Sequence, residues 1–476
     1  MITVHRFRQG NLCFAVDGGS AAIHGLDEVA YEVLGVWLEL YESGGRCLTC
    51  HGQGGPEDRR ACLERVLDGC NKIFAIYGAD TVKDAAGDLM ELVEAGLLFH
   101  DDAYVDDVAT GKLASSSLKA LCLNVSHDCN LRCRYCFAGT GNFGGERLNM
   151  PGSIARGAID FLLANSPGRE RVEVDFFGGE PLLNLPVVKE TVEYGRAQAQ
   201  SMGKEIRFTL TTNGLLLDED TASYLDQTMF NVVLSLDGRP AVNDLLRVTP
   251  KGAGTYKTIL PRLQHMAQLR QDRQYYVRGT YTAYNKDFFE DVRHLVEVGF
   301  DRVSVEPVVT DPEKPYALGA ADLQELFQQY DQLAEYYLAM EESGRGFEFY
   351  HFNLSLLEGQ CLAKRLTGCG AGSEYLAITP NGDIYPCHQF VGREHYVMGS
   401  IEDGSLDEGI RALFQGSHVL DKAECRGCWA RFFCSGGCHA NAVSRNGDIK
   451  QPDALSCALL KKRLECSIYI QGRLLD

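Results

Sequence analysis

The chain has 476 residues, 45% of them hydrophobic and 23% charged, a composition typical of a soluble globular protein with two to four domains. Its formal charge of −19 argues against a nucleic-acid partner, because such proteins contact phosphates through clustered Lys and Arg. The sequence has no apolar run of the roughly eighteen residues that a membrane helix needs, and its first residues lack the apolar core of a signal peptide. We therefore expect a cytoplasmic protein with no membrane association.

Residues 1–108 are predicted to form a small α+β unit. The strand-like runs are 4–7, 12–16 and 21–26, followed by a helix with Asp27 as N-cap, by helices over 57–67 and 81–95, and by a strand-like run at 97–99. This order suits a winged helix, but the acidity of the chain argues against DNA binding. The unit resembles the peptide-recognition domain of peptide-modifying enzymes, which takes an extended leader segment as an added strand. A structural or oligomerisation module is the alternative.

Residues 118–345 alternate strand-like runs with amphipathic segments, after a predicted linker at 115–117. The runs are 121–125, 172–177, 206–211, 232–236, 276–282 and 303–308. Six such βα units predict a parallel sheet with right-handed crossovers, either an open doubly wound sheet or a partial barrel. In both arrangements the functional site lies at the C-terminal ends of the strands.

The ends of these predicted strands carry polar or glycine-rich motifs. The first leads into Cys129-Asn130-Leu131-Arg132-Cys133-Arg134-Tyr135-Cys136, the second into Gly178-Gly179-Glu180-Pro181, the third into Thr212-Asn213-Gly214 and the fourth into Ser235-Leu236-Asp237-Gly238. Glycine lets backbone groups approach a ligand, and a carboxylate beside it can hold an ammonium group. Each motif alone is typical of a turn, but their succession indicates a ligand-binding edge.

The three cysteines of the first motif indicate an iron–sulfur cluster. A [4Fe–4S] cluster takes one thiolate per iron, so Cys129, Cys133 and Cys136 can hold one and leave its fourth iron open. This spacing, with an aromatic residue before the last cysteine and G-G-E-P after the next strand, resembles the radical S-adenosylmethionine (SAM) enzymes. The resemblance implies an α/β fold with a six-stranded partial (β/α) barrel that binds SAM.

The same resemblance implies roles for individual residues. Gly178, Gly179 and Glu180 would meet the methionyl amino group, Ser235 would face the methionyl carboxylate, and Tyr135 would lie by the adenine. Asn213 and Arg278 are expected near the ribose and the carboxylate. In that family one electron from the cluster cleaves SAM, and the resulting 5′-deoxyadenosyl radical takes a hydrogen atom from an unactivated carbon.

Seven more cysteines fall within residues 369–457. They are Cys369, Cys387, Cys425, Cys428, Cys434, Cys438 and Cys457. A C-x-x-C pair is typical of zinc, so one or two structural zinc sites are the alternative. The complete order instead resembles the SPASM extension, which binds two auxiliary [4Fe–4S] clusters. We assign residues 1–108 to a winged-helix-like leader-recognition domain, 118–345 to the barrel and 346–476 to a SPASM domain.

A count of thiolates identifies one cysteine set as incomplete. Three clusters, the first with three cysteines, need eleven thiolates, and the two groups of three and seven cysteines fall one short. By the resemblance, Cys369, Cys387 and Cys438 hold the first auxiliary cluster, and the second set is Cys425, Cys428, Cys434 and Cys457. Either Cys361 supplies the missing thiolate, or an open iron binds a substrate thiolate and acidifies it.

The three regions together resemble maturases of ribosomal peptides, most closely those that form Cys thioether crosslinks in SCIFF (ranthipeptide) precursors. This resemblance implies a Cys-rich precursor peptide with a leader segment and a flavodoxin- or ferredoxin-type reductant. His388 occupies the position of the Asp base of sulfatase-maturing relatives and is the candidate catalytic residue. The alternative reactions are formylglycine formation and carbon–carbon crosslinking, and the non-enzymatic alternative is an electron carrier or zinc scaffold.

Overall fold

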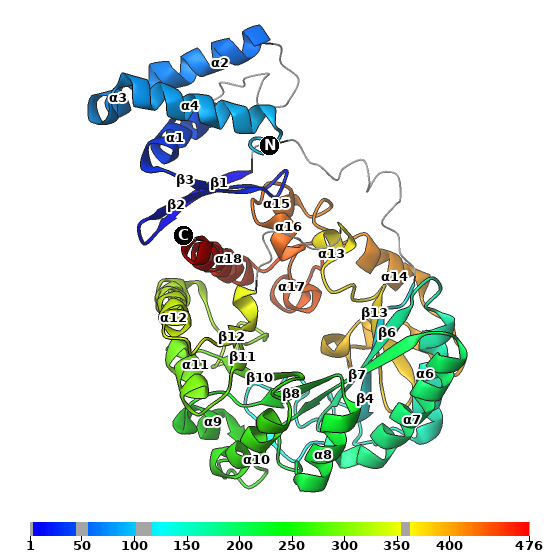
Figure 1. Cartoon of the computed structure of the whole chain (residues 1–476). Helices are drawn as coiled ribbons and strands as arrows, with labels where there is room; N and C mark the ends of the chain where they lie inside the picture. The colour runs from blue at the N-terminus through cyan, green and yellow to red at the C-terminus, as the bar shows by residue number, and fades with distance from the viewer. Residues whose placement is uncertain (1–2, 44–55, 101–116, 354–361, 476) are drawn as a thin grey trace.

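The computed structural model describes residues 3–43, 56–100, 117–353 and 362–475. Figure 1 shows a small N-terminal unit, a large sheet flanked by helices, and a helical C-terminal region that lies between them. None of the helices in the described ranges combines the length and the apolar character needed to span a bilayer.

The N-terminal unit begins with an antiparallel sheet in the order β1-β2-β3. Its strands are β1 (Val4–Gln9), β2 (Leu12–Asp17) and β3 (Ile23–Leu26). The turn after β2 is organised by Asp17, whose Oδ1 accepts hydrogen bonds from the backbone N–H groups of Gly19 (2.9 Å) and Ser20 (2.7 Å). The chain then reverses and pairs Val16 with Ile23.

Four helices complete this unit within the described residues: α1 (Glu28–Glu42), α2 (Pro56–Gly69), α3 (Asn71–Tyr77) and α4 (Ala79–Glu94). Asp27 caps α1 as predicted, since its Oδ1 accepts a hydrogen bond of 2.7 Å from the backbone N–H of Ala30. Helix α1 packs on the sheet and the other three pack on α1. The sequence did not predict α3.

The prediction of a strand at residues 97–99 was wrong. The chain bends there, with positive φ angles at Gly96 (68°) and Phe99 (57°). Leu98 and Phe99 are buried, and the Phe99 ring lies 5.3 Å from that of Trp37 on α1. The apolar character of this run therefore reflects burial against α1.

The large sheet confirms the six predicted parallel strands. They are β4 (Ala120–Ser126), β6 (Arg171–Gly178), β7 (Glu205–Thr212), β8 (Asn231–Ser235), β10 (Gln274–Tyr281) and β11 (Arg302–Pro307). They lie side by side in chain order, without the reversal that characterises a doubly wound sheet. The arrangement is therefore that of a partial barrel.

Helices connect these strands along the outer side of the sheet (Figure 1). They are α6 (Gly152–Ala164), α7 (Leu185–Ser201), α8 (Glu219–Thr228), α9 (Pro240–Leu246), α10 (Tyr256–Leu269), α11 (Phe288–Glu297) and α12 (Leu323–Glu342). Strand β6 shows how the two faces differ: Val172, Val174 and Phe176 are buried, whereas Asp175 and Phe177 alternate with them and keep partial exposure. On β6 the inner face is thus the more accessible one.

The C-terminal region continues the same sheet, which reaches ten strands in the order β12-β11-β10-β8-β7-β6-β4-β13-β14-β15. The added strands are β12 (Glu348–Phe349), β13 (Tyr375–Ile378), β14 (Asp383–Tyr385) and β15 (Gly399–Ser400). Strand β13 pairs in parallel with β4, the first strand of the barrel. In the described residues the C-terminal region also has the α-helices α13 (Leu362–Thr367), α14 (Glu408–Gln415), α15 (Ala423–Arg426), α16 (Arg431–Cys434), α17 (His439–Asn446) and α18 (Ala454–Leu475).

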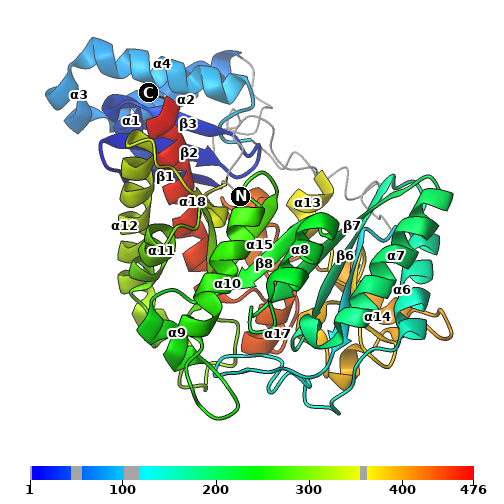
Figure 2. The ribbon, with the colours of Figure 1, turned by 60° about the horizontal axis from the view of Figure 1, so that its bottom comes forward.

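Helix α18 joins the barrel to the N-terminal unit. It packs along α12 and contacts β1, as Figure 2 shows from a second direction. Ile468 and Tyr469 of α18 share a buried core with Phe7 and Phe14 of the N-terminal sheet. Gly472 lies so close to Phe14 that a Cβ atom there would sit 2.7 Å from the ring.

Candidate active site

The cysteine loop follows β4 and is held by backbone contacts. A short antiparallel pair, β5 (Arg132–Cys133) with β9 (Arg247–Val248), fixes its middle, and the side chain of Arg132 donates to the carbonyl of Cys129 (2.6 Å). Burial raises the pKa of Cys129 to about 11 and that of Cys133 to about 12, and it also raises the pKa of Cys136. Iron binding would therefore displace thiol protons.

The G-G-E-P turn lies against this loop. The backbone N–H of Gly179 donates to Ser126 O (2.8 Å), and that of Glu180 donates to Asp128 O (2.9 Å). A Cβ atom on Gly178, whose φ is +128°, would lie 2.3 Å from Ser126 O, and one on Gly179 would lie 2.1 Å from Asp128 O. The two glycines are thus required for the contact between the strand ends.

Glu180 and Asn213 extend the connection to the third strand end. The buried carboxylate of Glu180 accepts hydrogen bonds from Thr212 Oγ1 (2.8 Å), from the backbone N–H of Asn213 (2.9 Å) and from that of Leu182 (3.1 Å). Asn213 Nδ2 then donates to Asn130 Oδ1 (2.7 Å) and lies 3.7 Å from the sulfur of Cys129. The structure therefore uses both predicted ligand-binding side chains to hold the cysteine loop.

Tyr135 lies in a buried polar cluster that the sequence did not reveal. Its hydroxyl donates to Asp237 Oδ1 (2.8 Å) and accepts a hydrogen bond from Arg247 Nη1 (2.7 Å). Asp237 could have been suspected from the S-L-D-G motif, whereas no sequence signal marked Arg247. Ser235 ends β8 and lies beside Arg278 of β10 in the sheet register.

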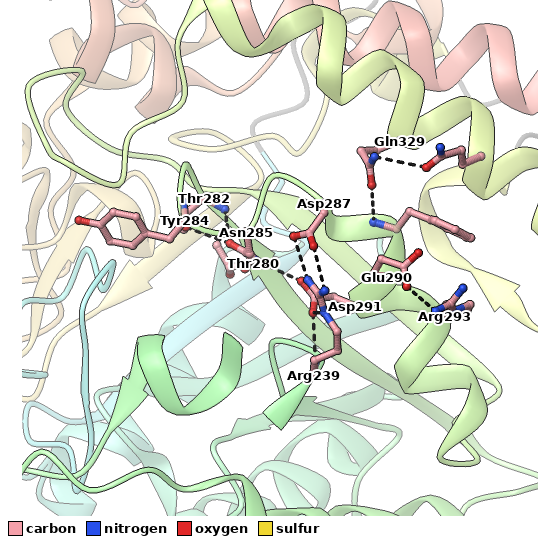
Figure 3. Close-up of polar contacts among 12 residues, drawn as sticks. Arg239, Thr280, Thr282, Tyr284, Asn285, Asp287, Glu290, Asp291, Arg293 and Gln329 are labelled. Atoms are coloured by element: carbon pink, nitrogen blue, oxygen red, sulfur yellow. Dashed lines mark hydrogen bonds and ion pairs between the residues drawn. The ribbon is translucent and has the colours of Figure 1, made fainter. Parts of the chain in front are cut away.

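The S-L-D-G loop is anchored to α11. Gly238 has φ of +122°, and a Cβ atom there would lie 2.3 Å from Cβ of Asp291, which is fully buried. Figure 3 shows Arg239 beside Asp291 and Asp287. Arg239 donates from its backbone N–H (3.1 Å) and from Nε (2.7 Å) to Asp291 Oδ1, and its guanidinium also binds the exposed Asp287. These bonds fix the position of Asp237 and, through it, of Tyr135.

Arg278 belongs to a charged network that links β10 and β11 to α18. It forms an ion pair with Glu306 of β11, which lies 3.5 Å from His351 Nε2, and Arg463 of α18 contacts His351 Nδ1 at 3.1 Å. Burial alone would raise the pKa of Glu306, but Arg278, His351 and Arg463 outweigh it and hold that pKa at about 2. Glu306 is therefore an anion at neutral pH and balances the positive charge of Arg278.

The C-terminal cysteines fall into two groups. Burial makes the largest contribution to the raised pKa of Cys387, and the next largest are the electrostatic effects of Cys438 and Cys369. The other four, Cys425, Cys428, Cys434 and Cys457, line one cavity of about 790 Å³ together with His5 of the N-terminal sheet. A smaller cavity of about 230 Å³ lies between Glu306, Cys438 and Cys434. Cys361, the candidate for the missing thiolate, lies outside the described residues.

These donor sets fit iron–sulfur clusters. Among the described residues, no three of His, Cys, Asp or Glu converge on one point as the ligands of a single ion do. A four-iron cluster does not require convergence, since each thiolate binds a different iron. In the four-cysteine set, burial together with Cys425 and Cys428 raises the pKa of Cys434 to about 11, so these thiols lie close enough to influence one another.

His388 faces the inner side of the barrel close to Cys387. Its ring packs against Phe177 (5.0 Å between centroids) and Phe137 (5.7 Å), and its Nδ1 lies 3.2 Å from the hydroxyl of Tyr375. Burial lowers the pKa of His388 to about 4, so the imidazole is neutral at pH 7. Tyr375 was not identified from the sequence.

Comparison with known proteins assigns the class of this architecture. Residues 123–309 match the model of the radical SAM superfamily, and residues 369–429 match that of an iron–sulfur cluster-binding (SPASM) domain. The chain thus has the radical SAM fold, a parallel β/α sheet, with a C-terminal SPASM domain. The matches support binding of SAM and of iron–sulfur clusters.

Individual relatives are similar at lower identity. The cysteine-type anaerobic sulfatase-maturating enzyme of Clostridium novyi is 23% identical over 355 residues, which cover 68% of this chain and 88% of the relative. The structure of native anSMEcpe with bound AdoMet and Cp18Cys peptide has a TM-score of 0.60 at 21% identity, covering 75% of this chain and 98% of that one. SuiB of Streptococcus suis with S-adenosylmethionine has a TM-score of 0.50 at 18% identity, covering 95% and 98%.

Proposed function

We propose that this protein is a radical SAM maturase that forms thioether crosslinks between Cys sulfur and acceptor carbons of a Cys-rich ribosomal peptide. The observation that carries the proposal is the division of the C-terminal thiols into a set of four and a set of three. The set of three, Cys369, Cys387 and Cys438, leaves one position that Cys361 or a substrate thiolate would fill. That set also borders the inner face of the barrel through His388, where the substrate would lie.

The residues of the barrel would position SAM. When bound, SAM and a [4Fe–4S] cluster on Cys129, Cys133 and Cys136 would supply the hydrogen-abstracting chemistry. The wall beside the cluster would be formed by Gly178, Gly179 and Glu180 at the amino group, by Ser235 and Arg278 at the carboxylate, by Asn213 at the ribose and by Tyr135 at the adenine. The fixed hydrogen bonds among these residues support the assignment, because they preorganise the site.

The N-terminal unit would bind the leader segment of the peptide. Strand β1 lies against α18, whereas β3 (Ile23–Leu26) pairs only with β2 among the described residues and so offers an edge of this sheet. An extended leader would add to β3 through backbone hydrogen bonds. This supports our assignment of residues 1–108 as the leader-recognition domain, ahead of the barrel (118–345) and the SPASM domain (346–476).

His388 would accept the proton that the substrate thiol releases. The neutral imidazole has an acceptor nitrogen at pH 7, and Tyr375, Phe177 and Phe137 hold the ring in place. A flavodoxin- or ferredoxin-type reductant would deliver electrons, and we expect two auxiliary [4Fe–4S] clusters besides the one on the cysteine loop.

Formylglycine formation is the second candidate, favoured by the similarity to an anaerobic sulfatase-maturating enzyme. The two reactions differ in their products. Thioether formation removes two hydrogens per crosslink and consumes a thiol, whereas formylglycine formation replaces the side-chain thiol with an aldehyde.

The test is anaerobic incubation of the reconstituted protein with a Cys-rich precursor peptide, SAM and dithionite, followed by mass spectrometry. The proposal predicts a loss of two hydrogens per crosslink and no loss when the peptide thiols are alkylated beforehand. An aldehyde that reacts with a hydrazine probe would favour the second candidate. Crosslinking that survives thiol alkylation would indicate carbon–carbon bonds, and an unchanged peptide mass with SAM cleaved would contradict the proposal.

Metal analysis tests the cofactor content separately. Three clusters predict about twelve iron and twelve sulfide per chain. Stoichiometric zinc in place of iron would support a structural zinc scaffold.

A further inference from the structure

Arg247 places a buried cation directly beside the cysteine loop. It stands opposite Cys133 in the β5–β9 pair, and its residue surface is only 8% exposed. Directly opposed residues of an antiparallel pair project to the same face with Cβ atoms about 4.5–5.5 Å apart. The side chains of Arg247 and Cys133 therefore share one side of this ribbon.

The guanidinium of Arg247 is held in place, but one of its N–H groups has no acceptor among the described residues. Its Nη1 donates to the hydroxyl of Tyr135 (2.7 Å) and lies 3.6 Å from Asp237 Oδ1. Its Nε is buried and has no hydrogen-bond partner among the described residues. A buried N–H without a partner is costly, which indicates that a group absent from the protein chain accepts this hydrogen bond.

The surroundings of Arg247 are negative. The carboxylates of Asp237 and Glu180 are both buried near it, and three thiolates join them when iron binds. Arg247 is opposite Cys133 in the strand pair and is hydrogen-bonded to Tyr135, which directly precedes Cys136, so its charge lies within the cysteine loop.

We propose that Arg247 is a positioning residue that tunes the first cluster: its buried charge stabilises the reduced, more negative form, and its free Nε–H donates to a sulfur of that cluster. Reduction adds one negative charge next to a fixed cation, and little water is present to screen it. Removal of the cation makes reduction less favourable and lowers the potential. The inference depends on the radical SAM site and not on thioether formation.

The test is redox titration monitored by electron paramagnetic resonance, on reconstituted protein without SAM. We expect Arg247→Met and Arg247→Gln to make reduction of the first cluster at least tenfold less favourable, which corresponds to a fall of about 59 mV for a one-electron couple. Arg247→Lys keeps the charge and is expected within about threefold of wild type. Tyr135→Phe removes the hydroxyl but keeps the cation, so its effect is expected to be similarly small.

Arg134→Met is the matched control. It removes a positive charge from the same loop, next to Cys133, but from an exposed side chain whose charge water screens. We expect its potential within about threefold of wild type. Circular dichroism and iron content establish that each variant is folded and loaded.

Two outcomes would overturn the inference. One is a potential in Arg247→Met equal to that of wild type at full iron content. The other is weaker SAM binding by Arg247→Met with no change of potential in the SAM-free protein, which would make Arg247 a SAM ligand. If both neutral variants fold but fail to retain the first cluster while Arg247→Lys retains it, the dependence on charge supports the inference.

Discussion

At the scale of single residues, the site depends on close backbone contacts more than on side-chain chemistry. Gly178 and Gly179 let one strand end approach the cysteine loop within hydrogen-bond distance, and Glu180 joins that contact to Asn213. The G-G-E-P motif, which the sequence suggests as ligand-binding, thus also holds the cysteine loop in place. Its substitution would alter the loop before it alters any ligand.

Gly179→Ala tests the contact between the G-G-E-P turn and the cysteine loop. The added Cβ would lie 2.1 Å from the carbonyl oxygen of Asp128, which is backbone and cannot move freely, so we expect a loss of about 2–3 kcal/mol in stability and a loss of iron from the first cluster. Thermal melts and iron analysis measure both effects. Gly145→Ala is the control, since its Cβ would meet only the carbonyl oxygen of Asn142 at 3.6 Å. Full iron content in Gly179→Ala would contradict the prediction.

Asp175 on the inner face of the barrel predicts a pH dependence. Burial, reinforced by Glu173, raises the pKa of Asp175 to about 7, above the value of about 3.9 for an unfolded chain. The folded state then keeps a proton that the unfolded state has released, so this residue makes stability fall as pH rises from about 4 to 7.

Asp175→Asn should remove that fall and stabilise the protein by about 2 kcal/mol at pH 8, after allowance for partial exposure. Thermal melts between pH 5 and 8 measure it. Glu170→Gln, an exposed carboxylate before the same strand, should leave the pH profile unchanged. Equal slopes for wild type and Asp175→Asn would exclude this explanation.

At the scale of elements, the loops at the strand ends are held by pairings between distant segments. The S-L-D-G loop is tied to α11 through Arg239 and Asp291, and the cysteine loop is tied to β9 through β5. The first tie joins neighbouring βα units, whereas the second joins the unit that begins with β4 to the unit that begins with β8. The site is therefore assembled by the barrel as a whole.

Asp291→Asn tests the contact between Arg239 of the S-L-D-G loop and Asp291 of α11. The change keeps the shape but removes the charge that Arg239 faces, and we expect a loss of about 2 kcal/mol, less than for a fully buried pair because Arg239 is partly exposed. Asp287→Asn removes the exposed partner of the same arginine and should cost under about 1 kcal/mol. Denaturant titration compares the two. A larger loss for Asp287→Asn would refute this account.

The sequence predicted the elements better than their contacts. All six barrel strands were identified because buried parallel strands are short apolar runs with turn residues at their ends. The run at 97–99 was mistaken for a strand for the same reason, because burial against Trp37 favours the same apolar residue types as a buried strand does. Arg247 and the second role of Glu180 were missed because their partners, Tyr135 and Thr212, are 112 and 32 residues away, which local patterns do not encode. Tyr375 is only 13 residues from His388, but its position depends on the pairing of β13 with β4, a strand much earlier in the chain.

At the scale of the molecule, the N-terminal unit forms part of the wall around a cysteine set. The ring of His5 stacks on Trp429 at 4.3 Å and 8°, and His5 Nε2 lies 2.8 Å from Glu465 of α18. Arg431 Nε donates to the carbonyl of Gly18 at 2.9 Å. Deletion of the unit would therefore also uncover α18 and one cysteine cavity, so point substitutions give the cleaner experiment.

His5→Ala should lower stability by about 1–2 kcal/mol, through loss of the ring stack and of the contact with Glu465. Iron should also be released severalfold faster to a chelator, because the cavity of the four cysteines loses part of its wall. His5→Phe keeps the stack and should show about half of the stability loss. His265→Ala, an exposed histidine on α10, should change neither quantity. Unchanged iron release in His5→Ala would contradict the shielding role.

The pairing of β13 with β4 has a consequence for the biogenesis of this protein. All seven residues of β4 are buried, yet its partner strand lies about 250 residues later in the chain. During synthesis the nascent barrel therefore presents an unpaired apolar edge until residues 375–378 have left the ribosome. Such an edge recruits other chains. We expect truncations before β13 to aggregate, and cluster insertion to await the completed chain.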